Sequence, residues 1–350
     1  MNKKFNLERI VRKNILDLKP YRSARDDFDS GILLDANENS YGSPIKSDLE
    51  LNRYPMPYQE KLRSVIAEYR KVDTENVFVG VGSDEAIDLL FRIFCSPGKD
   101  KVITNPPTYG MYKVSANINN IKVDEVLLTP DFQLQTEQIL NRVTDFTKLI
   151  FVCSPNNPTA NDRKDIIYLL ENYDGLVVVD EAYIDFSEQA GFAEEVKNYP
   201  NLVVLQTLSK AFGLAGIRLG IAIANPDIIN YMMNVKAPYN VNKLTSQAAL
   251  NGFENLESVQ KNIGSINSEK NRIVAELENL AHVEKVFPSD ANFLLFKVDD
   301  ALNVYKKLAD SGVIVRYRGN EPHCENCLRM TIGTTQENDQ FLSSLIKILG

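Results

Sequence analysis

The chain has 350 residues, of which 44% are hydrophobic and 25% are charged, so a soluble globular protein of one large domain or two domains is expected. Its 47 acidic and 39 basic residues give a net charge of −8, which argues against general binding of nucleic acid. The sequence contains no run of about 18 apolar residues, so no membrane span is expected. The first residues lack the apolar centre of a signal peptide, which predicts a cytoplasmic location.

The N-terminal residues predict an amphipathic arm that uses Leu7, Ile10, Val11 and Leu18. The segment 31–57 is rich in Asn, Pro, Gly and Tyr and predicts an ordered loop.

The middle of the chain alternates short apolar runs with amphipathic segments, the pattern of βαβ units in a mainly parallel sheet. Several of these runs are continuous and β-branched, as expected for strands that are covered on both faces. After Ser83, apolar residues recur at helical spacing. The strands of this seven-stranded sheet are expected at 77–81, 101–104, 122–128, 148–152, 176–179, 202–206 and 219–224.

From about residue 230 the pattern predicts a smaller α+β domain. Helices are expected at 243–280, 301–311 and 337–349, and strands at 292–298, 313–316 and 328–332. The α/β fold therefore divides into an arm and loop associated with the small domain and a dimer (1–40), a large domain (41–235) and a small domain (236–350).

The cysteines and histidines do not predict a metal site. Cys324 and Cys327 form a single C-x-x-C beside His323, and His282 is the only other histidine. Because a zinc site needs about four ligands, two free thiols in a loop are the preferred interpretation. Scarce histidine also argues against Ser-His-Asp catalysis.

Lys210 is the strongest candidate for a catalytic residue, because it follows the apolar strand 202–206. A desolvated lysine has a lowered pKa and becomes a nucleophile. A lone lysine at a strand end would ordinarily face solvent. Its neighbours at other strand ends change that interpretation.

The first neighbour is a turn with Gly82, Ser83 and Asp84 at a predicted helix start. Such a turn can bind an anion through free backbone N–H groups, although Ser83 and Asp84 also suit a helix N-cap. Glu85 excludes a dinucleotide fingerprint, and Ile93 excludes a P-loop.

Asp180 ends a buried strand, where a carboxylate needs a cation such as a protonated pyridine nitrogen. Ser209 and Arg218 provide a hydroxyl and a guanidinium that suit a phosphate. Tyr109 could stack on a ring. Together these groups describe a pyridoxal-phosphate site.

On these residues, the chain resembles the fold-type-I pyridoxal-phosphate-dependent aminotransferases along nearly its full length. The segments that carry the resemblance are Ser154-Pro-Asn-Asn157-Pro-Thr, Asp180 to Tyr183 and Thr207 to Gly220. The family's final Gly in the first segment is Ala160 here. The resemblance implies that Lys210 holds the cofactor aldehyde and moves the substrate proton, Asp180 holds the ring nitrogen, and Asn157 and Tyr183 bind the ring oxygen. It also implies the remaining cofactor contacts, made by Ser83, Asp84, Tyr109, Thr207, Ser209 and Arg218.

The resemblance further implies a homodimer, in which Tyr54 reaches the cofactor phosphate of the other subunit. The resemblance is greatest to members of the family that act on histidinol phosphate, a phosphorylated amine. In those members 2-oxoglutarate accepts the amino group and becomes glutamate. The residues that the resemblance assigns to the substrate are Tyr21 in Pro-Tyr-x-Ser-Ala-Arg25, Asn37, Arg316 and Arg329.

Other functions stay open at this point. An aromatic amino-acid aminotransferase and a threonine-phosphate decarboxylase would share the lysine and the fold. A non-catalytic regulator that binds the same cofactor belongs to a different class, and the complete catalytic set argues against it. A nicotinamide dehydrogenase lacks its fingerprint.

Overall fold

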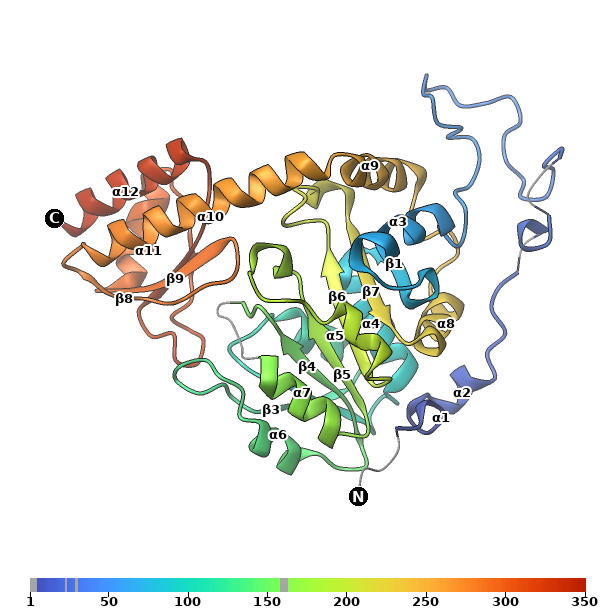
Figure 1. The fold of residues 1–350 in the computed structure, drawn as a ribbon, viewed down its shortest axis with the longest axis horizontal. Coiled ribbons are helices and arrows are strands. Elements are labelled where there is room, and N and C mark those ends of the chain that lie inside the picture. Colours follow the sequence, from blue (N-terminus) through green and yellow to red (C-terminus); the bar gives the residue numbers. More distant parts are fainter. Residues whose placement is uncertain (1–4, 23, 29–30, 158–162) are drawn as a thin grey trace.

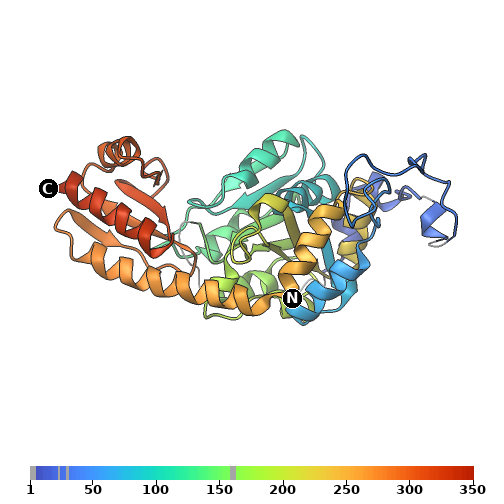
Figure 2. The same ribbon diagram turned by 90° about the horizontal axis from the view of Figure 1, so that it is seen from above.

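The structure is a computed structural model that describes residues 5–22, 24–28, 31–157 and 163–350. Two β-sheets organise it, joined by the long helix α10 (Leu256–Glu278), which runs from one sheet to the other (Figures 1 and 2). The larger sheet has seven strands in the order β1-β7-β6-β5-β4-β2-β3. Their bounds are β1 Val77–Val81, β2 Lys101–Thr104, β3 Lys122–Glu125, β4 Thr147–Cys153, β5 Leu176–Asp180, β6 Leu202–Thr207 and β7 Leu219–Ala224.

The predicted mainly parallel sheet is confirmed. Strands β2 to β6 pair in parallel, while β7 is antiparallel to both β1 and β6. The start of β7 therefore lies beside the C-terminal ends of β4, β5 and β6. The predicted strand 122–128 is too long, since β3 ends at Glu125. Beyond that residue, the N–H groups of Val126 and Leu128 still donate to the carbonyls of Thr104 and Pro106.

Helices cover both faces of the larger sheet, which explains its continuous apolar strands. One face packs against α3 (Glu60–Arg70), α6 (Thr136–Arg142), α7 (Arg163–Asn172) and α9 (Lys243–Glu254). The other packs against α4 (Gly82–Phe94), α5 (Met111–Ile118) and α8 (Pro226–Val235). Short 3₁₀ helices lie at Ala24–Asp26, Thr74–Asn76, Ile184–Phe186, Ala193–Lys197 and Ala215–Ile217.

The smaller sheet is antiparallel, with four strands in the order β10-β11-β9-β8. Helices α10, α11 and α12 pack against it. The bounds are β8 Val283–Val286, β9 Phe293–Val298, α11 Ala301–Asp310, β10 Arg316–Tyr317, β11 Cys327–Thr331 and α12 Thr335–Leu349.

Sequence patterns failed at three places in this C-terminal part. The predicted helix 243–280 is two helices, which meet at Asn255. Strand β8 was missed, because it is short and carries Glu284 and Lys285. Strand β10 contains only the last residue of the predicted strand 313–316.

The N-terminal arm packs on the larger sheet's side of the molecule. It contains α1 (Leu7–Ile10) and α2 (Lys13–Leu16), and Val11 and Ile15 are buried in the same core cluster as α4. Leu18, which the amphipathic pattern placed inward, is 38% exposed. Within one chain the described part of the arm lies away from the small sheet (Figure 1), and its association with the small domain and a dimer stays a prediction. The three domain boundaries stay predictions.

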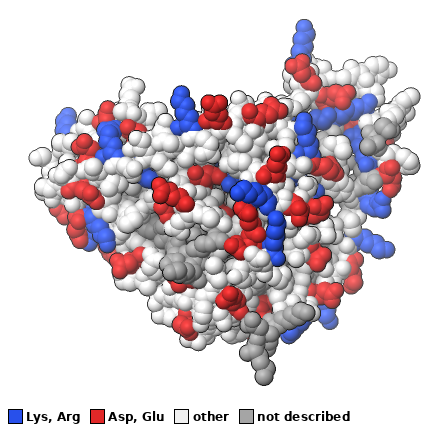
Figure 3. All heavy atoms as spheres, viewed as in Figure 1, with Lys and Arg blue, Asp and Glu red and all other residues white. Residues whose placement is uncertain are grey.

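On the face shown in Figure 3, Lys and Arg are interspersed with Asp and Glu. Among the described helices, none is both long and apolar enough to cross a membrane.

Candidate active site

A cavity opens where β4, β5 and β6 end and β7 begins. Open α/β sheets bind ligands at this edge. Every residue that the sequence analysis placed around the cofactor, except Tyr54, lines this cavity. The lining residues are Ser83, Asp84, Tyr109, Cys153, Asn157, Asp180, Ala182, Tyr183, Thr207, Ser209, Lys210 and Arg218.

One end of the cavity is built to bind an anion. Helix α4 begins at Gly82, and its N-cap residue Val81 provides no side-chain hydrogen bond. Ser83 and Asp84 lie inside the first turn, so the N-cap interpretation of these residues is wrong. The Gly82 N–H donates to the Arg218 carbonyl at 2.9 Å, so the N–H groups of Ser83 and Asp84 are the ones that the helix start offers to a ligand. Arg218 lies beside this turn, with Nη2 3.6 Å from Asp84 Oδ2.

Gly82 is required at this turn. Its φ is +72°, and a Cβ atom there would lie 2.7 Å from Nη2 of Arg218. A side chain would thus displace the guanidinium from the helix start.

Lys210 lines the cavity, with its Nζ 5.7 Å from the centroid of the Tyr183 ring. Burial lowers the pKa of Lys210, and the positive charges of Arg329 and Arg218 lower it further. A lysine in this setting loses its proton more readily and gains nucleophilicity.

Asp180 lies at the end of β5 and is buried. Burial raises the pKa of this carboxyl, while hydrogen bonds from Tyr112 and from the backbone of Ala182 oppose the rise. The Tyr112 hydroxyl donates to Oδ2 at 2.7 Å, and the Ala182 N–H donates to Oδ1 at 3.1 Å. A cation in the cavity would complete the stabilisation of this carboxylate.

Asn157 connects the cavity to the smaller sheet. Its Nδ2 donates to the Tyr183 hydroxyl at 3.4 Å, and its Oδ1 accepts from Arg329 Nη1 at 2.5 Å. The Arg329 guanidinium also lies 5.1 Å from the centroid of the Phe293 ring. An arginine of β11 is therefore held at the cavity. The rest of the predicted loop (158–160) lies outside the described residues.

Comparison with known proteins identifies the family. Residues 29–345 match the family Aminotransferase class I and II. The chain belongs to this aminotransferase family.

Similar proteins include the histidinol-phosphate aminotransferases of Flavobacterium johnsoniae and Parabacteroides distasonis. The first is 49% identical over 97% of this chain and 98% of its own length, and the second is 48% identical over 97% and 98%. Among solved structures, the histidinol-phosphate aminotransferase of Clostridium acetobutylicum superposes with a TM-score of 0.79, at 24% identity over 85% of this chain and 91% of the other. At that identity the last likeness shows the fold alone.

This aminotransferase is pyridoxal-phosphate-dependent, as its family is. The donor set of the cavity fits that cofactor. A helix start and Arg218 suit the phosphate, Lys210 suits the aldehyde, and Asp180 suits the ring nitrogen.

Two predicted substrate residues, Arg316 and Arg329, lie opposite each other in the antiparallel pair of β10 and β11. Arg318 follows, and its N–H donates to the Cys327 carbonyl at 2.9 Å, which continues the ladder. Because side chains alternate along a strand, Arg316, Arg318 and Arg329 belong to one face of the sheet. Cys327 shares this face and packs in the larger sheet's core cluster, so the face points toward the larger sheet.

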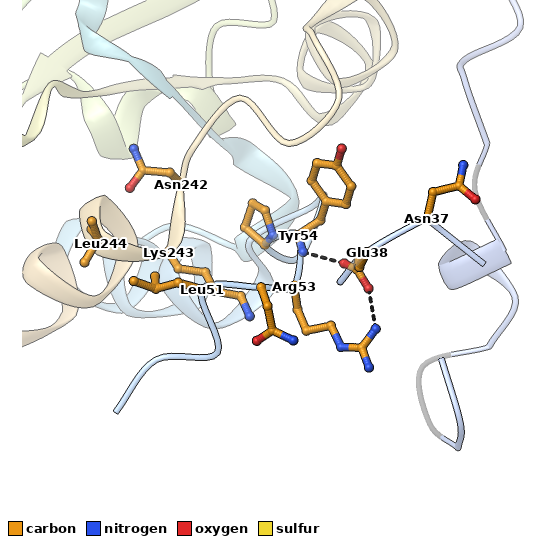
Figure 4. Close-up of a pocket in the computed structure, with 10 residues that line it drawn as sticks. Asn37, Glu38, Leu51, Arg53, Tyr54, Asn242, Lys243 and Leu244 are labelled. Atoms are coloured by element: carbon orange, nitrogen blue, oxygen red, sulfur yellow. Dashed lines mark hydrogen bonds and ion pairs between the residues drawn. The ribbon is translucent and has the colours of Figure 1, made fainter. Parts of the chain in front are cut away.

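Five predicted site residues do not line the Lys210 cavity of their own chain. Arg316 and Arg329 lie on the smaller sheet, from which Arg329 contacts the lining residue Asn157, and the other three line separate hollows. Asn37 and Tyr54 line a separate hollow of about 380 Å³, where the Tyr54 N–H donates to Glu38 at 2.5 Å (Figure 4). The Tyr54 ring stacks on Tyr239 at 4.7 Å. Tyr21 lines a third hollow, beside Tyr239. Its motif neighbour Ser23 lies outside the described residues.

Sequence reasoning missed Tyr112, Cys153, Ala182 and Arg318. Arg318 could have been predicted if the strand had been extended beyond residue 316, because Arg316 and Arg318 are two positions apart and therefore share a face. The C-x-x-C thiols are both free and fully buried. In the described part of the chain, no group of three or more His, Cys, Asp or Glu side chains is placed to hold a metal ion.

Proposed function

We propose that this aminotransferase moves an amino group between L-histidinol phosphate and 2-oxoglutarate, as a step of histidine biosynthesis. The observation that carries the proposal is the sheet face that Arg316, Arg318 and Arg329 share, from which Arg329 contacts Asn157 of the Lys210 cavity. A phosphate monoester carries up to two negative charges and suits several guanidinium groups. The names of the relatives at 45–49% identity support the same substrate.

Each residue of the cavity has a proposed role. The cofactor, when bound, supplies an aldehyde for the substrate amine and a ring that accepts electrons. Lys210 Nζ removes a proton from the substrate carbon and later returns one. Asp180 would hold the ring nitrogen protonated, Asn157 and Tyr183 would bind the ring oxygen, and Tyr109 would pack against the ring. The phosphate contacts come from Ser83, Asp84, Thr207, Ser209 and Arg218.

The half-reaction tests this proposal. Holoenzyme incubated with histidinol phosphate alone should make one ketone product per site and then stop. Adding 2-oxoglutarate should restart the reaction with formation of glutamate. Continued turnover of histidinol phosphate without 2-oxoglutarate would contradict amino transfer.

We also propose a homodimer in which Tyr54 serves the cavity of the other subunit. Several large apolar side chains of the arm and loop are exposed in one chain, and this segment extends away from the body (Figure 1). Exposed apolar surface of this kind is typical of an interface. The most exposed are Tyr21, Phe28, Ile32, Leu34 and Tyr41. A cytoplasmic location stays a prediction.

Subunit mixing tests the action of Tyr54 in trans. Lys210→Ala and Tyr54→Ala are each expected to be nearly inactive as pure dimers. Hybrid dimers would contain one intact site, so full exchange should recover about a quarter of wild-type activity. No recovery in proven hybrids would place Tyr54 in its own subunit's site.

A further inference from the structure

Tyr112 holds Asp180 from behind the cavity. This tyrosine lies on α5, has 1% of its surface exposed and does not line the cavity. Its ring stacks on Phe151 at 4.8 Å and meets the edge of Tyr109 at 5.6 Å. The hydroxyl therefore has a fixed position, 2.7 Å from Asp180 Oδ2.

The direction of this hydrogen bond, from the Tyr112 hydroxyl to the Asp180 carboxylate, determines which protonation state of Asp180 it stabilises. A phenol donates to a carboxylate, so it stabilises the ionised form of Asp180 over the protonated form. Burial keeps the phenol itself protonated, because it raises the pKa of Tyr112 well above its usual value. The second oxygen accepts the Ala182 N–H. Each carboxylate oxygen thus has one donor from the protein and an acceptor site left for a ligand.

We propose that Tyr112 is a positioning residue that keeps Asp180 ionised and so keeps the proton on the cofactor ring nitrogen. The inference rests on the proposed role of Asp180. Without the hydroxyl, the proton shared between Asp180 and the ring would move toward the carboxylate. The ring would then accept electrons less well, while substrate contacts would stay in place.

Tyr112→Phe tests this, because it removes one oxygen and keeps the ring packed on Phe151. Holoenzyme carrying ¹⁵N in the cofactor ring is examined by NMR, and the ring nitrogen signal of the variant should move toward the unprotonated value. The kcat should fall about tenfold with KM nearly unchanged, as for loss of one hydrogen bond to a charged group. Tyr173→Phe is the matched control, since Tyr173 is a buried tyrosine in the other core cluster. It should change neither readout.

A Tyr112→Phe signal identical to that of wild type would overturn the inference. Asp180→Asn separates this failure from failure of the underlying role. If Asp180→Asn leaves the ring nitrogen signal unchanged, Asp180 does not hold the ring nitrogen, and the proposed site is wrong. If Asp180→Asn shifts the signal and Tyr112→Phe does not, only the proposed role of Tyr112 is wrong.

Discussion

Arg316 lies directly opposite Arg329 across the antiparallel pair of β10 and β11. Burial lowers the pKa of Arg329; Tyr183 opposes this effect, whereas the positive charges of Arg318 and Arg316 add to it. The nearest carboxylate recorded for Arg318 within the described residues is Glu321, at 3.7 Å. Like charges gathered in this way repel one another unless an anion joins them. The arrangement therefore favours an anionic substrate between the two sheets.

The first prediction concerns Arg318, whose side chain is 12% exposed. Arg318→Gln should raise KM for histidinol phosphate by roughly 10-fold or more, because hydrogen bonds to charged groups contribute about 1.5–3 kcal/mol. The KM for 2-oxoglutarate should rise less, since a carboxylate carries less charge than a phosphate. Steady-state kinetics with both substrates measures the difference. Arg92→Gln, at a half-exposed arginine of α4, is the control.

The second prediction concerns Lys210. Lys210→Ala should fold and bind the cofactor, but lose turnover by at least about 10³-fold. It should also lose the visible absorbance of the lysine-bound cofactor. Lys113→Ala, at a lysine whose side chain is 60% exposed, should keep both properties. Normal turnover by Lys210→Ala would remove this lysine from the chemistry.

The third prediction separates function from stability at Asp180. Asp180→Asn should lower kcat by about 10²–10³-fold, the range for loss of one preorganised charge partner. The same variant should stabilise the cofactor-free protein at neutral pH by roughly 1–3 kcal/mol, because a buried carboxylate without a cation is costly.

The pH dependence of this stability follows from the raised pKa of Asp180. The folded protein holds a proton on Asp180 that the unfolded chain releases. The free energy of unfolding therefore falls as pH rises above about 3.8, the ordinary pKa of Asp. Denaturant unfolding of the cofactor-free proteins at several pH values checks this. A wild-type to Asp180→Asn difference that does not grow with pH would contradict the assignment.

The fourth prediction concerns Glu38, which anchors the loop that carries Tyr54. Burial would raise the pKa of Glu38, but hydrogen bonds from Arg25, the Tyr54 N–H and Arg53 outweigh it and lower the pKa from 4.5 to about 2. The anchor is therefore complete above pH 4.5 and is lost as pH falls through about 2. Glu38→Gln should remove roughly 1–3 kcal/mol of stability at pH 6.

Unfolding of wild type and Glu38→Gln at pH 6 and pH 2 measures this anchor. The two proteins should converge at the lower pH. A constant difference would mean that the charge of Glu38 does not hold the loop. Gln133→Ala, at an exposed loop residue, controls for loss of an ordinary surface contact.

Sequence patterns predicted the larger sheet well, because its strands are covered on both faces and read as continuous apolar runs. The bounds 77–81, 101–104 and 219–224 agree with β1, β2 and β7. The smaller sheet was predicted less well. Strand β10 has two residues, and its register depends on pairing with β11 rather than on its own composition.

The cavity could be predicted because its residues follow successive strand ends, which the fold brings to one edge. Tyr112 could not, since its hydroxyl meets Asp180 only through the packing of α5 against Phe151. Tyr54, Asn37 and Tyr21 lie outside the Lys210 cavity of their own chain. The proposed role of Tyr54 needs a second subunit, which one chain does not contain.

The most direct test of the proposed function compares kcat/KM for histidinol phosphate, phenylalanine and threonine phosphate, each with 2-oxoglutarate, while glutamate and carbon dioxide are measured. The account predicts that histidinol phosphate is preferred by at least about 10²-fold, with one glutamate formed per amine consumed. Equal use of phenylalanine, or carbon dioxide release from threonine phosphate at the highest kcat/KM, would contradict it.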